Sequence, residues 1–313
     1  MGRLLEAVEA DPETLVIVMS DHGFGPVHSF FLLNNWLVEQ GLLRFKGGLR
    51  TGLKRLLFRL GVTPLTSFRI AKALGLGRLR KKMRFQQKAG LVNKVFLSFD
   101  DVDWARTRAF GIGSFGQIYV NLAGRYPEGS VSPGQEYEDL KDWIARQALA
   151  LRDPRTGQPL VERVYRREEI YSGRYLERTP DLILQPRGWE YMAFGHADFG
   201  SHRLVEPIAG LSGHHRLEGV VILAGGGVQP GARLQGASIL DVAPTILHAL
   251  DVAVPEEMDG RVLQEAFQAS SPLARPVRTS PESVYKEGPA EPGLADEEME
   301  EVQEKLRGWG YAG

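Results

Sequence analysis

The 313-residue sequence predicts an α/β protein in which a mainly parallel sheet is flanked by helices. Three short apolar runs carry this prediction: residues 15–19, 181–184 and 220–224. The first of them, Leu-Val-Ile-Val-Met, contains no polar residue, as expected of a strand that is covered on both faces. The segments between the runs are long enough for crossover connections, so we expect all three strands in one sheet.

Residue patterns between these runs predict the remaining helices and strands. Apolar residues at helical spacing predict a helix over 28–43, and 107–121 is expected to be extended around a glycine-rich middle. A Ser-Pro start and an Asp-Pro end delimit a helix over 133–151. A short strand is expected at 161–164. A proline in the first turn, where its missing N–H costs little, favours a helix over 241–250.

Composition narrows the class of protein. A hydrophobic content of 43% supports a buried core, and the absence of cysteine excludes disulfides, thiolate metal sites and cysteine nucleophiles. The first residues lead into a charged amphipathic helix rather than a signal peptide, and no apolar run approaches membrane-spanning length. We therefore expect a cytoplasmic protein, or one that is peripheral to a membrane.

Charge is distributed unevenly along the chain. Between Gln40 and Phe99 there are fifteen lysines and arginines and no acidic residue, which leaves 23 basic against 39 acidic residues elsewhere. Glycine and proline break this span into short amphipathic helices with leucines on one side. We predict that residues 40–99 form a helical insertion that projects from the sheet and carries a continuous positive surface.

Three explanations of the basic insertion remain open from the sequence. It can be a solvated helical insertion without a binding role. It can be a lid or docking surface for an anionic phosphate substrate or an anionic lipid surface, since leucine and phenylalanine alternate with lysine and arginine as in interfacial helices. Nucleic acid ranks third and is an unlikely partner, because clustered charge fits a polyanion but no known binding module accompanies it.

The first apolar run leads directly into Asp21 and His22, which are followed by glycines at 23 and 25. Functional groups in open α/β sheets lie at the carboxyl ends of such strands. A carboxylate and an imidazole from adjacent residues can turn onto one divalent cation, and both are ligands for Zn²⁺. The alternative is a simple turn after a strand, with His22 exposed to solvent.

Further motifs occur in a fixed order along the chain. They are Asp21-His22-Gly23-Phe24, residues 110–121, Gly195-His196-Ala197-Asp198, residues 212–219 and residues 241–247. This set resembles the carboxyl-terminal portion of an alkaline-phosphatase-superfamily protein of the type I phosphodiesterase/nucleotide pyrophosphatase kind, in its phosphohydrolase or phosphomutase branch. The resemblance covers roughly residues 1–268 and implies an alkaline-phosphatase-like α/β core.

The resemblance implies a site with two divalent metal ions, Zn or Mn, and a small phosphorylated substrate. Asp21 and His22 match the ligands of one ion. His215 matches a late histidine of the other, since Gly213-His214-His215 fits Gly-x-His, and His214 is the competing choice.

The same resemblance places the other ligands and a Ser or Thr nucleophile before Asp21. The twenty residues there contain neither a strand-borne aspartate nor a plausible nucleophile loop. The nucleophile is therefore expected upstream of Met1, so the catalytic residue is unknown. The chain is accordingly expected to be an amino-terminally truncated fragment.

A polar, glycine-rich loop contains His196 and His202. It is either a surface loop or a substrate-binding loop, and we predict that these two histidines contact substrate. The triple glycine at 225–227 lacks the Lys-Ser/Thr of a phosphate-binding loop and is interpreted as a turn.

The sequence therefore predicts a metal-dependent hydrolase of phosphate mono- or diesters that is inactive or incomplete as this fragment. The rival hypothesis is a non-catalytic protein that attaches to an anionic membrane or to nucleic acid through residues 40–99. The predicted parts are the start of the α/β core with the metal motif (1–39), the basic insertion (40–99), the rest of the core (100–268) and a low-order acidic tail (269–313).

Overall fold

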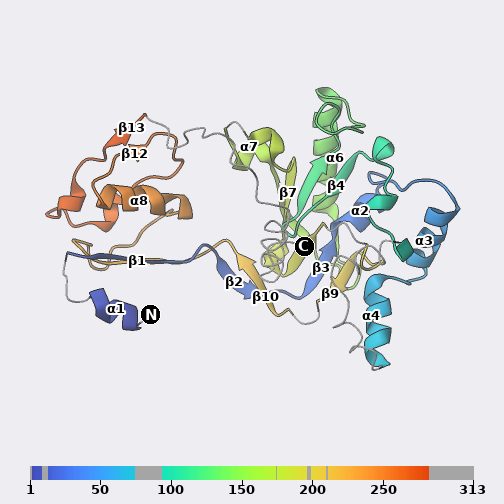
Figure 1. Cartoon of the computed structure of the whole chain (residues 1–313), viewed down its shortest axis with the longest axis horizontal. Coiled ribbons are helices and arrows are strands. Elements are labelled where there is room, and N and C mark those ends of the chain that lie inside the picture. Colours follow the sequence, from blue (N-terminus) through green and yellow to red (C-terminus); the bar gives the residue numbers. More distant parts are fainter. Residues whose placement is uncertain are drawn as a thin grey trace, which may run out of the picture. The chain divides into compact units, whose positions relative to one another are not determined.

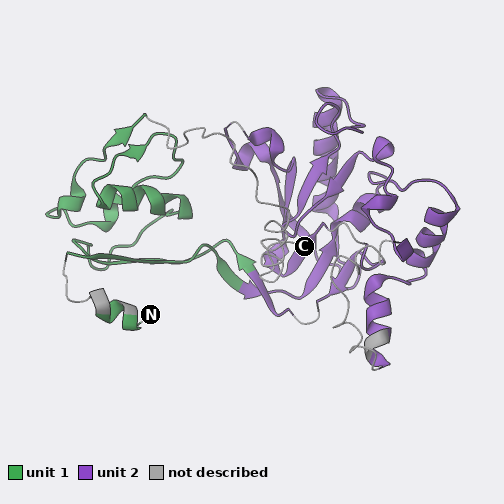
Figure 2. Ribbon diagram, in the orientation of Figure 1, with its two compact units in different colours: residues 1–24, 215–312 green, residues 25–214, 313 purple. Residues whose placement is uncertain are grey.

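The chain folds into two compact units, which we describe in turn. In the computed structural model the described residues are 2–8, 13–74, 94–173, 175–195, 199–208 and 211–281 (Figure 1). Unit 1 comprises residues 1–24 and 215–312, and unit 2 comprises residues 25–214 with the last residue (Figure 2).

Unit 1 is built on two antiparallel strands. β1 (Leu15–Met19) pairs with β11 (Val221–Gly225), with Ile17 opposite Leu223. The helix α8 (Val242–Ala249) has a proline in its first turn, as the sequence predicts. Unit 1 also has the helix α1 (Gly2–Val8) and the short strands β12 (Val254–Pro255) and β13 (Thr279–Ser280), which pair in parallel.

Unit 2 contains two sheets. The four-stranded sheet has the order β4-β5-β7-β6 and every neighbouring pair is antiparallel. The three-stranded sheet has the order β8-β3-β9, with β3 parallel to β8 and antiparallel to β9. The strands are β3 (Ser29–Leu32), β4 (Ala109–Gly111), β5 (Gln117–Val120), β6 (Val161–Arg166), β7 (Leu182–Pro186), β8 (Tyr191–Phe194) and β9 (Val205–Pro207).

Helices cover these sheets and enclose the main core. The α-helices of unit 2 in the described ranges are α2 (Leu33–Glu39), α3 (Leu49–Arg59), α4 (Pro64–Ala73), α6 (Gln135–Ala150) and α7 (Arg167–Ile170). α6 packs on β6 and β7, and α2 packs on β4 and β8. Trp36 of α2, Ile144 of α6 and Leu182 of β7 are all fully buried in one hydrophobic cluster. Among the described helices, none is long and apolar enough to cross a bilayer.

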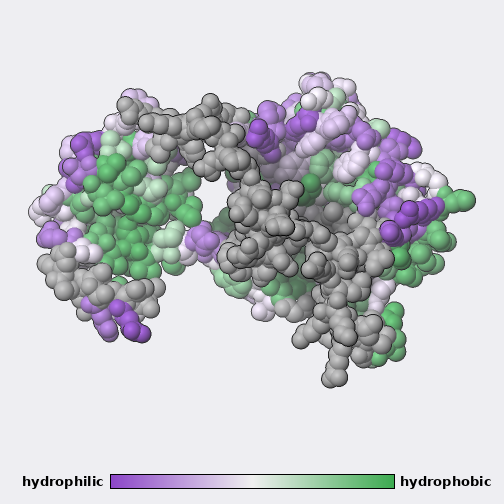
Figure 3. Space-filling view, in the orientation of Figure 1, coloured by the Kyte–Doolittle hydropathy of each residue, from purple (hydrophilic) through white to green (hydrophobic). Residues whose placement is uncertain are grey.

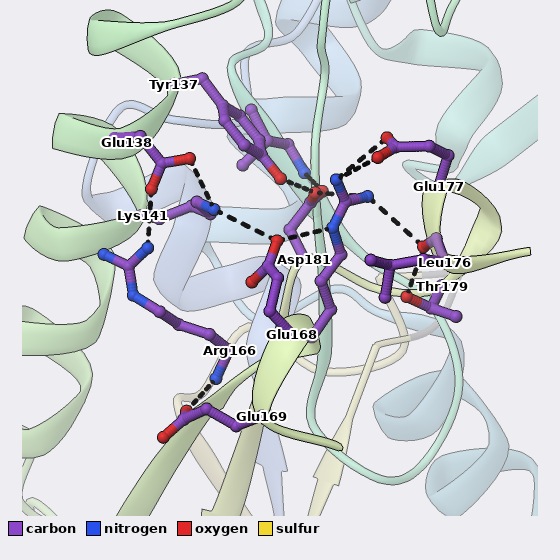
Figure 4. A network of polar contacts seen from close by, with 12 residues as sticks. Tyr137, Glu138, Lys141, Arg166, Glu168, Glu169, Leu176, Glu177, Thr179 and Asp181 are labelled. Carbon is purple, nitrogen blue, oxygen red and sulfur yellow. Dashed lines mark hydrogen bonds and ion pairs between the residues drawn. The ribbon is translucent and has the colours of Figure 1, made fainter. Parts of the chain in front are cut away.

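A network of polar contacts fastens α6 to the four-stranded sheet (Figure 4). Its centre is the fully buried carboxylate of Asp181, which accepts hydrogen bonds from the Tyr137 hydroxyl at 2.5 Å and from both terminal nitrogens of Arg125. The backbone N–H of Val120 donates a further bond of 2.6 Å to Asp181. Four donors thus surround one carboxylate, so its charge is fully hydrogen-bonded although it has no contact with solvent.

The prediction of an α/β fold is consistent with this architecture, but that of one mainly parallel sheet is wrong for the described strands. Residues 15–19 and 221–225 do pair, yet antiparallel, and 182–186 belongs to a different sheet. The burial of β1 is only partial rather than complete on both faces. A continuous apolar run encodes burial without encoding the direction of the partner strand, because either direction brings apolar residues opposite one another.

Most other predicted elements occur within a few residues of their expected ends. The extended segment 107–121, the helix 133–151, the strand 161–164 and the helix 241–250 correspond to β4 and β5, α6, β6 and α8. The helix predicted over 28–43 is shorter: its first part is the strand β3, and only α2 is helical. Pairing of β3 with β8 and β9 outweighs the local helical pattern there.

Two of the predicted parts are only partly described. In the basic insertion the structure has α3 and α4, whereas 75–93 lies outside the described residues. In the predicted low-order tail (269–313), β13 pairs with β12. The rest of the tail, from residue 282, lies outside the described residues.

Candidate functional site

The Asp21-His22 pair directly follows β1 in unit 1. Ser20, the residue before the pair, is bonded to Val220, the residue before β11, by two hydrogen bonds. Its backbone N–H donates to the carbonyl of Val220 at 3.0 Å, and the N–H of Val220 donates to the Ser20 hydroxyl at 2.9 Å. These bonds hold the end of β1 against the segment that leads from His215 into β11.

Glycine is required where the two segments meet. A Cβ on Gly23 would lie 2.0 Å from the backbone carbonyl oxygen of Glu218, and one on Gly219 would lie 2.7 Å from the Ser20 hydroxyl. The chain continues from Gly23 into β2 (Gly23–Pro26), which pairs with β10 (Gly213–Arg216). The glycine that follows the Asp-His pair is therefore needed for close packing between two backbone segments.

The structure brings the three predicted metal ligands together. The rings of His22 and His215 are stacked, with centroids 3.7 Å apart and an interplanar angle of 21°. His22 Nε2 lies 3.5 Å from a carboxylate oxygen of Asp21. The other ring nitrogen, Nδ1, is 2.7 Å from the carbonyl oxygen of Gly23, an acceptor, so Nδ1 carries the proton and Nε2 presents its lone pair.

Electrostatics favour a neutral imidazole at the second histidine. The pKa of His215 is lowered from its ordinary value, first by burial and then by the neighbouring His22, while Asp21 acts in the opposite direction. A lowered pKa keeps the neutral form dominant at neutral pH. The neutral form is the one that binds metal ions.

The distances around His22 fit part of a metal site. Two ligand atoms with bonds of about 2.0–2.2 Å at a tetrahedral zinc ion lie about 3.4 Å apart, close to the 3.5 Å between His22 Nε2 and Asp21. His215 cannot bind the same ion. The nitrogen lone pairs lie in the planes of the two rings, and because these planes are nearly parallel and the ring centroids are 3.7 Å apart, the planes meet much farther from the rings than a metal–nitrogen bond reaches. In the described ranges no group of three or more candidate ligands is arranged to hold one ion.

A cavity of about 640 Å³ lies beside the Asp-His pair, entirely within unit 1. This volume is within the range of about 300–1,000 Å³ that is common for small-molecule sites. His22 lines the cavity, whereas His215 is not among its lining residues. The polar residues that line it are Ser20, Asp21, His22, Arg216, Glu218 and Ser238.

The other predicted histidines belong to unit 2. The His214 ring lies 5.1 Å from that of Phe115. His202 packs edge-on against Phe58, and its Nδ1 is buried without a hydrogen-bond partner. His196 lies outside the described residues. The predicted contact of His196 and His202 with substrate stays a prediction.

The nucleophile is expected upstream of Met1, and none of the residues described above for this site is given that role. Met1 itself lies outside the described residues, and α1 begins at Gly2. Of the hydroxyl side chains before Asp21, that of Ser20 accepts the bond from Val220 and thereby holds the strand end in place. The position of the catalytic residue before Met1, and the fragment status that goes with it, therefore stay predictions.

Sequence reasoning missed two residues of this site. Ser20 lines the cavity and also positions the Asp-His pair. In the sequence it is only a serine after an apolar run, which is equally typical of an ordinary turn. Arg216 places a positive charge on the cavity wall. Its position next to His215 in the sequence was the one available indication, and pairing of β10 with β2 was needed to bring it to the cavity.

In unit 1, a strand-end Asp-His pair thus lies beside a cavity of the size of a small-molecule site. Residues 1–203, well over half of the chain, match the family model of the type I phosphodiesterase/nucleotide pyrophosphatase proteins, and the chain belongs to that family. This family is a group of phosphoester hydrolases that generally depend on divalent metal ions, and the match confirms the resemblance to the alkaline phosphatase superfamily.

The extent of the match bears on the individual residues. It includes Asp21 and His22 but ends before His215, whose place in the site therefore rests on its stacking against His22. No curated protein and no solved structure gave a significant match to the chain.

Proposed function

We propose that the chain is a metal-dependent hydrolase of small phosphate mono- or diesters, and that Asp21 and His22 hold one divalent cation, Zn²⁺ or Mn²⁺. The observation that carries the proposal is the 3.5 Å separation of His22 Nε2 from the Asp21 carboxylate. The bond between His22 Nδ1 and the Gly23 carbonyl supports it, because it leaves Nε2 unprotonated and fixes the ring.

His215 is proposed as a ligand of a second cation. Stacked rings with centroids 3.7 Å apart direct their lone pairs along nearly parallel planes. That spacing equals the separation of about 3.5–4 Å between the ions of two-metal phosphoesterase sites. Each histidine can therefore serve a different ion, which a single-ion site would not allow.

Cations bound at these positions would stabilise the negative charge that develops on a phosphate ester during hydrolysis. Residues of the chain itself orient the metal ligands and bind the phosphate group. Gly23 holds the His22 ring, and Ser20 holds the end of β1 beside the cavity. Arg216 supplies a positive charge that favours a phosphate group in the cavity.

The proposal is tested by calorimetric titration of the full chain with Zn²⁺ and Mn²⁺. The expected result is two binding events for the unaltered chain. His215→Ala should remove one, whereas Asp21→Asn and His22→Ala should each remove the other, because each change deletes a ligand of one ion only. Hydrolysis of p-nitrophenyl phosphate and bis-p-nitrophenyl phosphate, measured in parallel, distinguishes a monoesterase from a diesterase. Absence of hydrolysis with both cations bound is the result expected if the nucleophile lies upstream of Met1.

His28→Ala is the matched control, since His28 is an exposed histidine of unit 2 that is assigned no role in the site. It should leave both binding events unchanged. Metal binding that survives the double change Asp21→Asn and His22→Ala with undiminished affinity and stoichiometry would show that the proposed ligands are wrong.

A further inference from the structure

An apolar stripe runs along the solvent side of α3. It consists of Leu49, Leu53, Leu56 and Leu60, whose exposed fractions are 96%, 58%, 53% and 71%. The spacing of four, three and four residues places them on one side of the helix. Figure 3 shows hydrophobic surface over this part of unit 2, and within the described part of the chain nothing covers it.

The opposite side of α3 is fastened to unit 2. Lys54 is buried, and its ammonium group donates to both carboxylate oxygens of Asp101, at 2.7 and 3.0 Å. Phe58 packs edge-on against Phe199. The helix therefore cannot roll to bury its leucines without breaking a buried ion pair, so the exposed stripe is a stable feature of the folded unit.

Positive charge flanks the stripe. At 3.6 residues per turn, Arg50 and Arg59 lie about 90° to either side of the leucines, and both are exposed. Neither they nor Arg55 form an ion pair with a carboxylate in the described ranges. In the described part of the insertion, Lys54 pairs with Asp101 and Arg69 with Glu206. These two charges are neutralised by acids of unit 2, whereas those of Arg50, Arg55 and Arg59 remain on α3.

We propose that α3 is a membrane-docking helix that lies in the plane of an anionic phospholipid surface, with its leucines among the acyl chains and its arginines at the headgroups. An apolar stripe between arginines is the pattern of interfacial helices. Ile70 and Leu74, one helical turn apart and exposed by 61% and 69%, add exposed apolar surface on α4 and directly after it.

Charge and apolar surface together favour an anionic bilayer over nucleic acid or a second copy of the chain as the partner of α3. Nucleic acid would contact the arginines and leave four exposed leucines in water. A second copy of the chain would bring two positive surfaces together, and the segment from residue 41 to residue 98 contains no acid to pair with them. An anionic bilayer satisfies the leucines and the arginines at once.

Flotation of the full chain with phosphatidylcholine vesicles, prepared with and without phosphatidylserine, tests the proposal. Binding is expected to the anionic vesicles and to weaken with added salt. Leu53→Glu and Leu56→Glu should each lower the partition coefficient by at least about tenfold, given the free energy of burying one leucine. Arg50→Gln and Arg59→Gln should each lower it by about fivefold.

The matched controls are Leu149→Glu and Leu250→Glu, which alter exposed leucines on other helices or at their ends and should leave partitioning unchanged. Asp21→Asn should also leave it unchanged, so failure of the metal site and failure of the docking surface are distinguishable. Equal partitioning of the Leu53→Glu variant and the unaltered chain would overturn the proposal. The proposal would also be overturned if the chain bound labelled DNA but no vesicles, and Leu53→Glu left the DNA binding unchanged. A dimer in solution that Leu53→Glu dissociates would overturn it as well.

Discussion

Replacing the buried carboxylate at the centre of the polar network tests whether that network stabilises unit 2. In Asp181→Asn one of two carboxylate oxygens becomes an amide N–H₂ group. Each oxygen of Asp181 receives two donors, the Tyr137 hydroxyl and one Arg125 nitrogen on one side, and Val120 N–H and the other Arg125 nitrogen on the other. Whichever way the amide turns, two donors lose their acceptor.

The expected destabilisation follows from these contacts. Each hydrogen bond to a charged group contributes about 1.5–3 kcal/mol, and removing one partner of a buried ion pair costs about 3–5 kcal/mol. The two values describe the same lost interactions and are not added. We therefore expect a fall of about 3–5 kcal/mol in the free energy of unfolding of unit 2. With a urea dependence of about 2 kcal/mol per molar, the unfolding midpoint falls by about 2 M.

Urea unfolding followed by tryptophan fluorescence measures this fall, since the buried Trp36 reports on the core of unit 2. The control is Asp139→Asn on the exposed side of α6, where Asp139 accepts one bond from Gln135; it should cost less than about 0.5 kcal/mol. A loss below about 1 kcal/mol for Asp181→Asn, less than one charged hydrogen bond contributes, would refute the reasoning that the network is a stabilising connection between α6 and the sheet.

The remaining predictions concern the site and the response to acid. Gly23→Ala should abolish the metal binding of the proposed site, because its Cβ would meet the Glu218 carbonyl at 2.0 Å and force apart the segments that carry the stacked histidines; unaltered calorimetric titration would contradict this. Bonds from Arg155 lower the pKa of buried Asp153 from 3.8 to about 2, and a depressed pKa stabilises the folded state above about pH 4 and ceases to do so as pH falls through about 2. Asp153→Asn should therefore cost about 2 kcal/mol at neutral pH, and its unfolding midpoint should converge with that of the unaltered chain near a pH of about 2.

Much of the local structure could be predicted from the sequence alone. The helix over 133–151 matches α6 (135–150) because its ends are set by neighbouring residues, a Ser-Pro start and an Asp-Pro end. Adjacent Asp21 and His22 after an apolar run sufficed to indicate a candidate site, since a strand end and two ligand-type side chains are local features. The family, too, followed from motifs in sequence order and was confirmed by the family model.

Tertiary contacts decided what local pattern could not. Five apolar residues predict that β1 is buried, but its antiparallel pairing with β11 depends on residues some two hundred positions away. The same holds for Lys54, which belongs to a run of basic residues in the sequence and forms a buried ion pair with Asp101 in the structure. His215 stacks on His22 because Ser20 is bonded to the residue that precedes β11. Local patterns record which side chains favour burial or exposure, whereas the free energy that selects a partner arises only when distant segments meet.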